Sequence, residues 1–291
     1  MINRILVPLD GSGLAERALP LAWGIASRTS SELLLLSAVV PQEPWAGQAR
    51  SDSNDSAEKA AANEYLEALA ERLRTPKQKV RTVAVTGRAV PAICSAAEAS
   101  GCDLIVIATH GRSGAERWYV GSVAERVRHA SRVPVLLVHA ARETIPQAAT
   151  IEKILVPLDG SKLAEEVLPL AEELAQSLGA TIVLQQVVPV SVNGDVDKPK
   201  EYLLSIAHDF AAKGVDVETR VDSGLPTQTI LEYADTNNVD LIAMTTHGHT
   251  ASDRFVMGSV ADAISRTVEI PCLVARAHNA AGAIDQRSSS K

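Results

Sequence analysis

The chain has 291 residues, of which 46% are hydrophobic, 22% are charged and only 3% are aromatic, and its formal net charge is −7. This length is enough for two domains of ordinary size, each with its own hydrophobic core. The acidic balance and the scarcity of aromatic side chains argue against DNA, RNA or an anionic membrane as a partner, because such binders normally carry basic patches or stacking platforms.

The chain contains a tandem repeat. Residues 5–12 and residues 154–161 both read ILVPLDGS, and residues 121–124 and residues 258–261 both read GSVA. Whole motifs that recur in the same order indicate a duplicated domain.

The repeat sets the expected domain boundaries. We expect a first domain over 1–140, a second domain over 151–278, and a disordered tail over 279–291, where the composition becomes polar. The first half is the longer one, and its surplus falls in the polar stretch 41–56, which predicts a mobile loop.

Strands and helices alternate along each half. The apolar run 33–36, which reads LLLL, is typical of a strand buried on both faces, and intervening helices imply parallel pairing with right-handed crossovers. In chain order, the first half predicts strand 4–9, helix 13–28, strand 33–39, helix 57–74, strand 79–85, helix 89–99, strand 103–108, helix 122–131 and strand 134–138. The fold class is therefore α/β, with two tandem doubly wound parallel sheets of five strands each.

The candidate binding residues follow the first and fourth strands of each half. Ligands of open parallel sheets bind beyond the carboxyl ends of the strands, at the topological switch point. Asp10 and Asp159 follow the first strands. Glycine-rich loops and helix starts, whose backbone N–H groups favour a phosphate, follow the fourth strands. The candidates there are Gly111, Arg112, Ser113, Gly114, Gly121 and Ser122 in the first half and Gly248, His249, Gly258 and Ser259 in the second.

Simpler structural explanations exist for parts of this pattern. Ser12 after Asp10 is a good helix cap, and Ser122 with Glu125, like Ser259 with Asp262, matches a capping box or its near relative. The joint recurrence of all these motifs, in the same order, favours a ligand site over helix capping alone.

At these residues the chain resembles the universal stress protein family in its tandem two-domain form. The nucleotide-binding signature of that family is Gly-x2-Gly-x9-Gly-[Ser/Thr]. Its last three positions are matched by Gly111, Gly121 and Ser122 in the first half and by Gly248, Gly258 and Ser259 in the second. The resemblance covers nearly all of both halves and implies an adenine-nucleotide-α-hydrolase-like, Rossmann-like fold.

The resemblance also implies a ligand and a mode of pairing. ATP, with or without Mg²⁺, would place its triphosphate on the glycine loop and its adenine against the backbone at Val39 and Val187. Asp10 and Asp159 would lie near the ribose, the phosphates or the metal ion. The fifth strands would pair, either within the chain as a pseudo-dimer or between two chains as a homodimer.

The first position of the signature departs from the family pattern. Ala108 and Thr245 stand where the family has glycine, and His249 stands where the first half has Arg112. A β-branched threonine adds bulk and stiffness beside a nucleotide, which predicts that the second site is the more altered one.

Three functions are compatible with these residues. The first is an ATP-binding stress-response regulator that is not an enzyme, in which the aspartates and glycines have no catalytic task. The second is an enzyme on the same fold, a slow ATPase or a nucleotidyl transferase, although no paired acid and base is evident. The third is a scaffold for unknown protein partners that binds little or no nucleotide.

The expected location is the cytoplasm. No apolar run approaches the roughly 20 residues that span a bilayer, and the chain enters a strand without a signal-peptide pattern. Cys94, Cys102 and Cys272 are odd in number and lack the spacing of metal ligands, so we expect reduced thiols and no metal site formed by cysteine.

Overall fold

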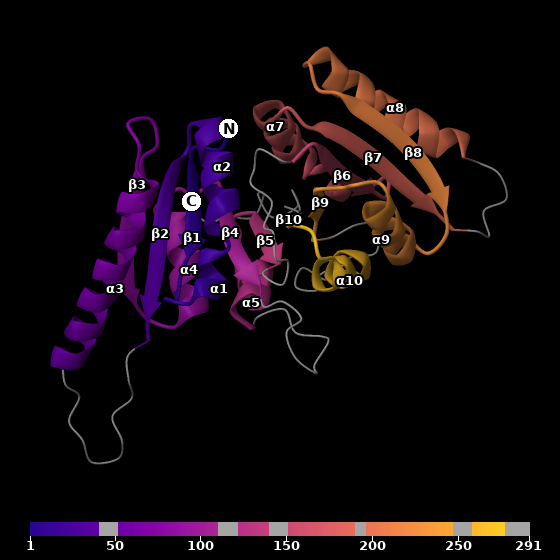
Figure 1. Ribbon diagram of the computed structural model, residues 1–291. Coiled ribbons are helices and arrows are strands. Elements are labelled where there is room, and N and C mark those ends of the chain that lie inside the picture. Colours follow the sequence, from indigo (N-terminus) through magenta and orange to yellow (C-terminus); the bar gives the residue numbers. More distant parts are fainter. Residues whose placement is uncertain (41–51, 110–121, 140–150, 190–195, 247–257, 277–291) are drawn as a thin grey trace, which may run out of the picture.

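The computed structural model describes residues 1–40, 52–109, 122–139, 151–189, 196–246 and 258–276. Two α/β halves with the same order of elements lie next to each other (Figure 1). Residues 141–150, between the two expected domains, and the expected disordered tail lie outside the described residues, so the tail stays a prediction.

The first half contains five strands and five helices in its described part. They are β1 (Arg4–Pro8), α1 (Gly13–Glu16), α2 (Leu19–Thr29), β2 (Glu32–Val39), α3 (Asp52–Leu73), β3 (Val80–Thr86), α4 (Ala89–Ala99), β4 (Leu104–Thr109), α5 (Ser122–Ala130) and β5 (Val135–His139).

The second half repeats this order over its own described residues. Its elements are β6 (Lys153–Leu158), α6 (Lys162–Glu165), α7 (Leu168–Leu178), β7 (Thr181–Val188), α8 (Asp197–Ala212), β8 (Val217–Ser223), α9 (Pro226–Thr236), β9 (Leu241–Thr245), α10 (Ser259–Thr267) and β10 (Cys272–Ala275).

The strands of each half are parallel and doubly wound, as predicted. The strand order is β3-β2-β1-β4-β5 in the first half and β10-β9-β6-β7-β8 in the second. Ile5 of β1 lies opposite Leu104 of β4, and Ile154 of β6 lies opposite Leu241 of β9. The first and fourth strands are therefore neighbours, and their carboxyl ends form the switch point at which a ligand is expected.

The two halves join through their fifth strands. β5 and β10 pair in antiparallel fashion, with Leu136 opposite Leu273, and the described strands thereby form one 10-stranded sheet. The two predicted five-stranded sheets are thus continuous, and the intramolecular form of the predicted pairing is the one observed. Because both fifth-strand edges are used within the chain, a homodimer would need another surface.

Each sheet face is covered by its own helices, which explains the apolar strands. Leu33 and Leu35 pack into the core under α2 and α3, whereas Leu34 and Leu36 pack into the core under α4. Alternate side chains of a strand point to opposite faces, so a strand that is apolar at every position can be buried on both sides.

The first predicted helix is divided into two. Residues 13–28 were expected to form one helix, but α1 ends at Glu16 and α2 begins at Leu19. Pro20 lies in the first turn of α2, where a backbone N–H would have no partner within the helix anyway. In the interior of one continuous helix over 13–28, its ring would clash with the preceding turn, so the helix is interrupted before it. Pro169 divides α6 from α7 in the same way.

The long helix of the first half begins earlier than predicted. The stretch 41–56 was expected to be a loop, yet α3 already begins at Asp52. Ser and Asp residues favour helix starts as well as loops, so polarity alone placed the boundary too late. None of the helices in the described part combines the length and the hydrophobicity that a membrane span requires.

Candidate functional site

An aspartate, a glycine and a serine build the turn after β1. Asp10 Oδ1 accepts hydrogen bonds from the backbone N–H of Ser12 at 3.0 Å and from Ser12 Oγ at 2.6 Å. Ser12 Oγ accepts a hydrogen bond from the N–H of Ala15 at 3.1 Å and thereby caps α1. Gly11 has a φ of 83°, a left-handed conformation that glycine adopts without strain. The predicted helix cap is confirmed, and it leaves the exposed Asp10 at the carboxyl end of β1.

The second half repeats this turn. Asp159 Oδ1 accepts a hydrogen bond from the N–H of Ser161 at 3.0 Å, and Ser161 Oγ caps α6 by accepting one from the N–H of Ala164 at 3.1 Å. Gly160 has a φ of 82°. The aspartate of each half therefore has a structural task in the turn, whatever else it binds.

The cap gives a direct prediction for stability. Ser12→Ala removes the acceptor of the Ala15 N–H, and we expect a loss of about 1 kcal/mol in the free energy of unfolding. Urea unfolding followed by circular dichroism measures this loss. Ser27→Ala is the matched control, because the Ser27 hydroxyl bonds only to carbonyls within its own helix and lies exposed. Equal effects of the two substitutions would contradict the cap assignment.

A cavity of about 160 Å³ lies at the carboxyl edge of the second half. Strands β6, β7 and β9 and the starts of α9 and α10 contribute to its wall. Four predicted site residues line it, namely Asp159, Val187, Gly258 and Ser259. Residues that are far apart in the sequence therefore meet at the predicted switch point.

The first turn of α10 presents backbone donors to this cavity. The first N–H that bonds within the helix is that of Asp262, which donates to Gly258 O at 3.0 Å. The N–H groups of Ser259, Val260 and Ala261 precede it, and all three residues line the cavity. The Gly258 N–H itself donates to Thr246 O at 2.6 Å. These amides have no acceptor within the helix, and together with the helix dipole they favour an anion at this position.

The first half has a corresponding cavity of about 120 Å³. Asp10 and Ala108 line it, together with Val123 from the first turn of α5. Two β2 residues line this cavity, Leu36 and Ala38. Ala38 is the counterpart of Val187, whereas Val39 lies one residue further along the strand. Val39 therefore lies one residue beyond the counterpart of Val187 and does not belong to the described lining of this cavity, although β2 and β7 end in the same register, at Val39 and Val188.

Thr245 does not close the second cavity. It lines the wall and is 6% exposed, yet this cavity is the larger of the two. Both volumes are below the roughly 300 Å³ at which pockets begin to enclose a small organic ligand. A ligand would be partly enclosed and would extend over the open edge of the sheet.

Seven predicted site residues cannot be placed. Gly111, Arg112, Ser113, Gly114, Gly121, Gly248 and His249 lie outside the described residues. Ser122 is the first residue of α5. The glycine loops therefore stay predictions from the sequence, and the described site consists of the strand ends and the helix starts.

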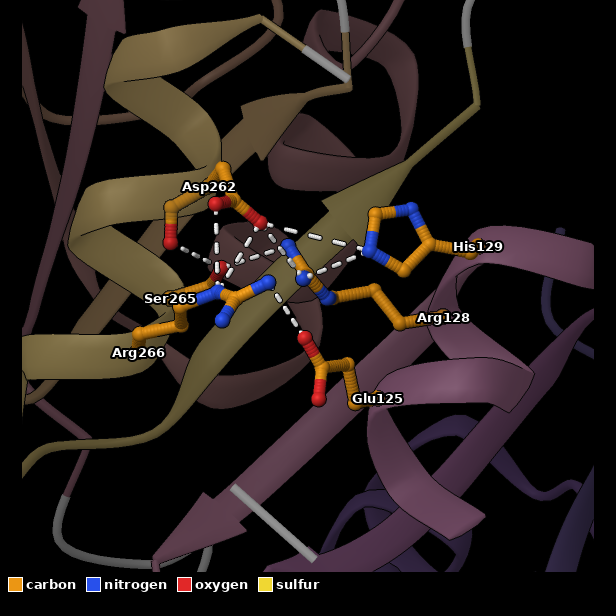
Figure 2. A network of polar contacts seen from close by, with 6 residues as sticks. All are labelled: Glu125, Arg128, His129, Asp262, Ser265 and Arg266. Carbon is orange, nitrogen blue, oxygen red and sulfur yellow. Dashed lines mark hydrogen bonds and ion pairs between the residues drawn. The ribbon is translucent and has the colours of Figure 1, made fainter. Parts of the chain in front are cut away.

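The capping box suggested for Ser259 and Asp262 is not formed at the start of α10, whereas the one suggested for Ser122 and Glu125 stays a prediction, because the Ser122 side chain lies outside the described part of the chain. Gly258 is the N-cap of α10 and makes no side-chain cap, so Ser259 is already the first helical residue. Glu125 and Asp262 instead belong to a network between α5 and α10, the interhelix network (Figure 2). Its members are Glu125, Arg128, His129, Asp262, Ser265 and Arg266.

The centre of the interhelix network is a buried guanidinium. The Arg128 side chain is 0% exposed, and its Nη2 lies 2.8 Å from Asp262 Oδ1 while its Nη1 donates to Ser265 Oγ at 2.7 Å. Desolvation would raise the pKa of Asp262, but the hydrogen bonds and charges of Arg128 and Arg266 lower it below its usual range. Burial and the adjacent Arg128 lower the pKa of His129.

One cavity residue was missed from the sequence. Gln185 of β7 lines the second cavity and is 0% exposed. Its counterpart in the first half is Leu36, since Pro157 pairs with Gln185 as Pro8 pairs with Leu36. A comparison of the two repeats position by position would have found this polar residue in an apolar strand.

Outside the switch points, a larger groove of about 450 Å³ lies between α2 and α3. Trp23, Leu69 and Leu73 contribute apolar surface to it, and Arg28 and Arg72 lie at its wall. The Trp23 indole N–H donates to Leu73 O at 3.0 Å. None of the predicted site residues that the structure describes belongs to this groove.

Comparisons with known proteins agree with the repeat. The model of the Universal stress protein family matches residues 1–139 and again residues 150–276. Universal stress protein MJ0531 of Methanocaldococcus jannaschii is 30% identical over 139 residues, which are 43% of this chain and 82% of that protein. Universal stress protein Rv2005c of Mycobacterium tuberculosis is 33% identical over 138 residues, which are 46% of this chain and 44% of that protein.

Solved structures match nearly the whole length of the chain. The crystal structure of a universal stress protein from Archaeoglobus fulgidus superposes with a TM-score of 0.77 at 23% sequence identity, and the match covers 95% of this chain and 99% of that one. At this identity the likeness shows the fold alone.

Proposed function

This chain belongs to the universal stress protein family, and we propose that it is a stress-response regulator that binds ATP at the switch point of each half without turning it over. The observation that carries the proposal is the recurrence of one arrangement. In each half, an aspartate at the end of the first strand and the first turn of the last helix line a single cavity.

The second cavity fits the parts of a nucleotide. The first-turn amides of α10 suit a phosphate group, because they are unpaired within the helix and lie at its positive end. Val187, Ile230 and Met244 form an apolar wall that suits a base. Asp159 also lines this cavity, so a ribose hydroxyl or a metal ion bound there would meet its carboxylate.

A magnesium ion would depend on the nucleotide. Among the described residues, no three His, Cys, Asp or Glu side chains gather in a way that could hold a metal ion. Mg²⁺ commonly binds through one or two carboxylates together with substrate phosphates. Asp10 and Asp159 are the residues that would supply such a carboxylate, and the ion would supply charge neutralisation for the phosphates.

A regulator fits the described lining better than an ATPase does. Asp159 is the one titratable side chain among the described residues that line the second cavity, and Asp10 is its counterpart in the first. One oxygen of each carboxylate is already held in the turn. Proton transfer to and from water needs a positioned acid or base, so we propose binding without efficient hydrolysis.

Location and assembly belong to the same proposal. A cytoplasmic location is supported by three free cysteines, which suit a reducing compartment. A homodimer and further protein partners stay predictions, and neither can use the paired edges of β5 and β10.

Calorimetric titration of the nucleotide-free protein with ATP and Mg²⁺ tests the proposal. We expect two ATP per wild-type chain and one ATP per chain in Gly258→Val, because the valine side chain would intrude on the phosphate position. Gly258 has a φ of −57°, which any residue can adopt, so the fold should survive. Gly258→Ala is the graded control and should weaken binding less than valine does.

The outcomes separate the three functions. Two ATP in a cooperatively unfolding Gly258→Val variant would remove the α10 start from the site. No binding by the wild type would leave the scaffold function, and turnover that Asp10→Ala or Asp159→Ala abolishes would establish an ATPase.

A further inference from the structure

The amide of Gln185 is held in one orientation by its neighbours. Gln185 Nε2 donates to Asp222 Oδ2 of β8 at 2.7 Å. A carboxylate only accepts hydrogen bonds at neutral pH, so the amide nitrogen must face Asp222 and the amide oxygen must face the other way. The two ends of this amide are therefore distinguishable from the hydrogen bonds alone.

The aspartate is itself fixed. Arg220 Nε and Nη2 donate to the two oxygens of Asp222, each at 2.6 Å, and the guanidinium lies 3.8 Å from the centroid of the Tyr233 ring. Arg220 holds the pKa of Asp222 below its usual range through its hydrogen bonds, with Gln185 adding to the effect, although burial opposes it. Asp222 thus stays an acceptor, and Gln185 is anchored by a chain of bonded side chains.

The opposite end of the amide has no partner. Gln185 Oε1 is buried and finds no hydrogen-bond donor in the part of the chain that the structure describes. Asp222 on β8 holds the nitrogen, and the cavity lies on the other side of Gln185, over the ends of β6 and β9. An unpartnered buried oxygen beside a cavity requires an explanation, and a ligand that donates a hydrogen bond supplies one.

The first half lacks this arrangement. At the positions of Gln185 and Arg220 in the register stand Leu36 and Val83, and Val85 stands where the second half has Asp222. The polar chain is therefore a difference between two otherwise repeated sites, and the first cavity offers an apolar surface at the same place.

We infer that Gln185 makes the second site selective for a nucleotide base that carries an exocyclic amino group, whereas the first site does not distinguish such a base by this contact. The inference rests on the proposed nucleotide binding. Adenine offers a 6-amino donor to Gln185 Oε1, whereas hypoxanthine offers a 6-oxo group, so that two acceptors would face each other. When the wrong ligand leaves a buried acceptor unpaired, the binding free energy falls by more than one lost hydrogen bond, because the acceptor has also lost its contact with water.

Competition between ATP and inosine triphosphate tests this inference, because the two nucleotides differ at the 6-position of the base. In the wild type, one of the two sites should prefer ATP by about tenfold or more, the size expected for one buried hydrogen bond. Gln185→Met keeps the side-chain volume and removes the acceptor. The ratio of the affinities of that site for ATP and for inosine triphosphate should then fall to about one. Gln185→Leu, which copies Leu36, should give the same result.

Gln186→Met is the matched control. Gln186 is the next residue of β7, its side chain lies on the other sheet face, and its Oε1 is also buried without a partner among the described residues. It does not belong to the described lining of the cavity, so this substitution should leave the preference for ATP intact.

The outcomes distinguish a failure of this inference from a failure of the proposed ATP binding on which it rests. A Gln185→Met variant that binds ATP with unchanged stoichiometry and an unchanged preference would overturn the role of Gln185, and a bound water would then be the partner of Oε1. Equal affinities of both sites for the two nucleotides in the wild type would overturn it as well. Failure of both nucleotides to bind the wild type would instead overturn the proposed function, and this inference with it.

Discussion

Asp262→Ala is expected to lower the free energy of unfolding by about 3 kcal/mol, the lower end of the range for breaking a buried ion pair. The substitution removes the Asp262 carboxylate, which lies 2.8 Å from the Arg128 guanidinium, and the Arg128 side chain is 0% exposed. We expect the lower end of this range because the Asp262 side chain is itself 32% exposed and Ser265 still accepts a hydrogen bond from Arg128. Guanidinium chloride unfolding of both variant and wild type measures the loss.

Glu125→Ala is the matched control for this loss. Glu125 and Arg266 form the related pair of the interhelix network, but Arg266 is 42% exposed, so we expect at most about 1 kcal/mol. A double variant, Arg128→Met with Asp262→Leu, should recover most of the stability, since apolar residues often replace a buried ion pair without cost. A loss below about 1 kcal/mol in Asp262→Ala would show that the other contacts of Arg128 or the solvent compensate its charge, and it would contradict the expected role of Asp262.

The same pair adds a dependence on pH. The lowered pKa of Asp262 means that its stabilising effect is present above the pKa of the unfolded chain, about 3.9, and is lost as the pH falls through the lower folded value. The difference between wild type and Asp262→Asn should therefore be constant near neutral pH and should shrink in acid.

The interhelix network also shows where sequence reasoning fails. Glu125 and Asp262 each lie three residues after a serine, so the local spacing suggested capping boxes. Their partners, Arg266 and Arg128, come from the other half of the chain. Local spacing cannot indicate such a contact, because it depends on how the two halves join.

The fold was predictable because its signals are local and repeated. The apolar strands such as 33–36, the alternation with helices and the recurrence of ILVPLDGS together indicate two doubly wound sheets, and the observed strand orders agree. The boundaries were less predictable. Hydrophobic periodicity predicted one helix over 13–28, but the chain is interrupted just before Pro20. Composition assigned residues 41–56 to a loop, but α3 begins at Asp52.

The site was predictable to the level of strand ends but not of individual wall residues. Asp159 and Gly258 were found because motifs repeat at the ends of neighbouring strands, and both line the second cavity. Gln185 was missed because its importance depends on Asp222, which becomes its neighbour only through the pairing of β7 with β8. Long-range pairs of this kind require the register of the sheet.

Between about pH 6.5 and pH 4, the protein is expected to lose about 3 kcal/mol of stability through His139 alone. Burial of this imidazole at the end of β5 lowers its pKa to about 4, and its Nδ1 lies 3.1 Å from Thr109 Oγ1 of β4. In the unfolded chain the group has a pKa of about 6.5, so the unfolded state binds more protons than the folded state between these values. Stability therefore falls as the pH falls through this window, and it is unaffected by His139 above it.

Chemical unfolding at a series of pH values, with the wild type and His139→Asn compared, measures this contribution. Asparagine keeps a hydrogen-bonding group near Thr109 but does not titrate, so its stability curve should be flatter between pH 6.5 and pH 4. His208→Asn is the matched control, because the His208 side chain is 86% exposed on α8 and should change the slope little. If His139→Asn and wild type lose stability in parallel, the His139 imidazole must be protonated in the folded protein without cost, and the acid sensitivity must come from the carboxylates.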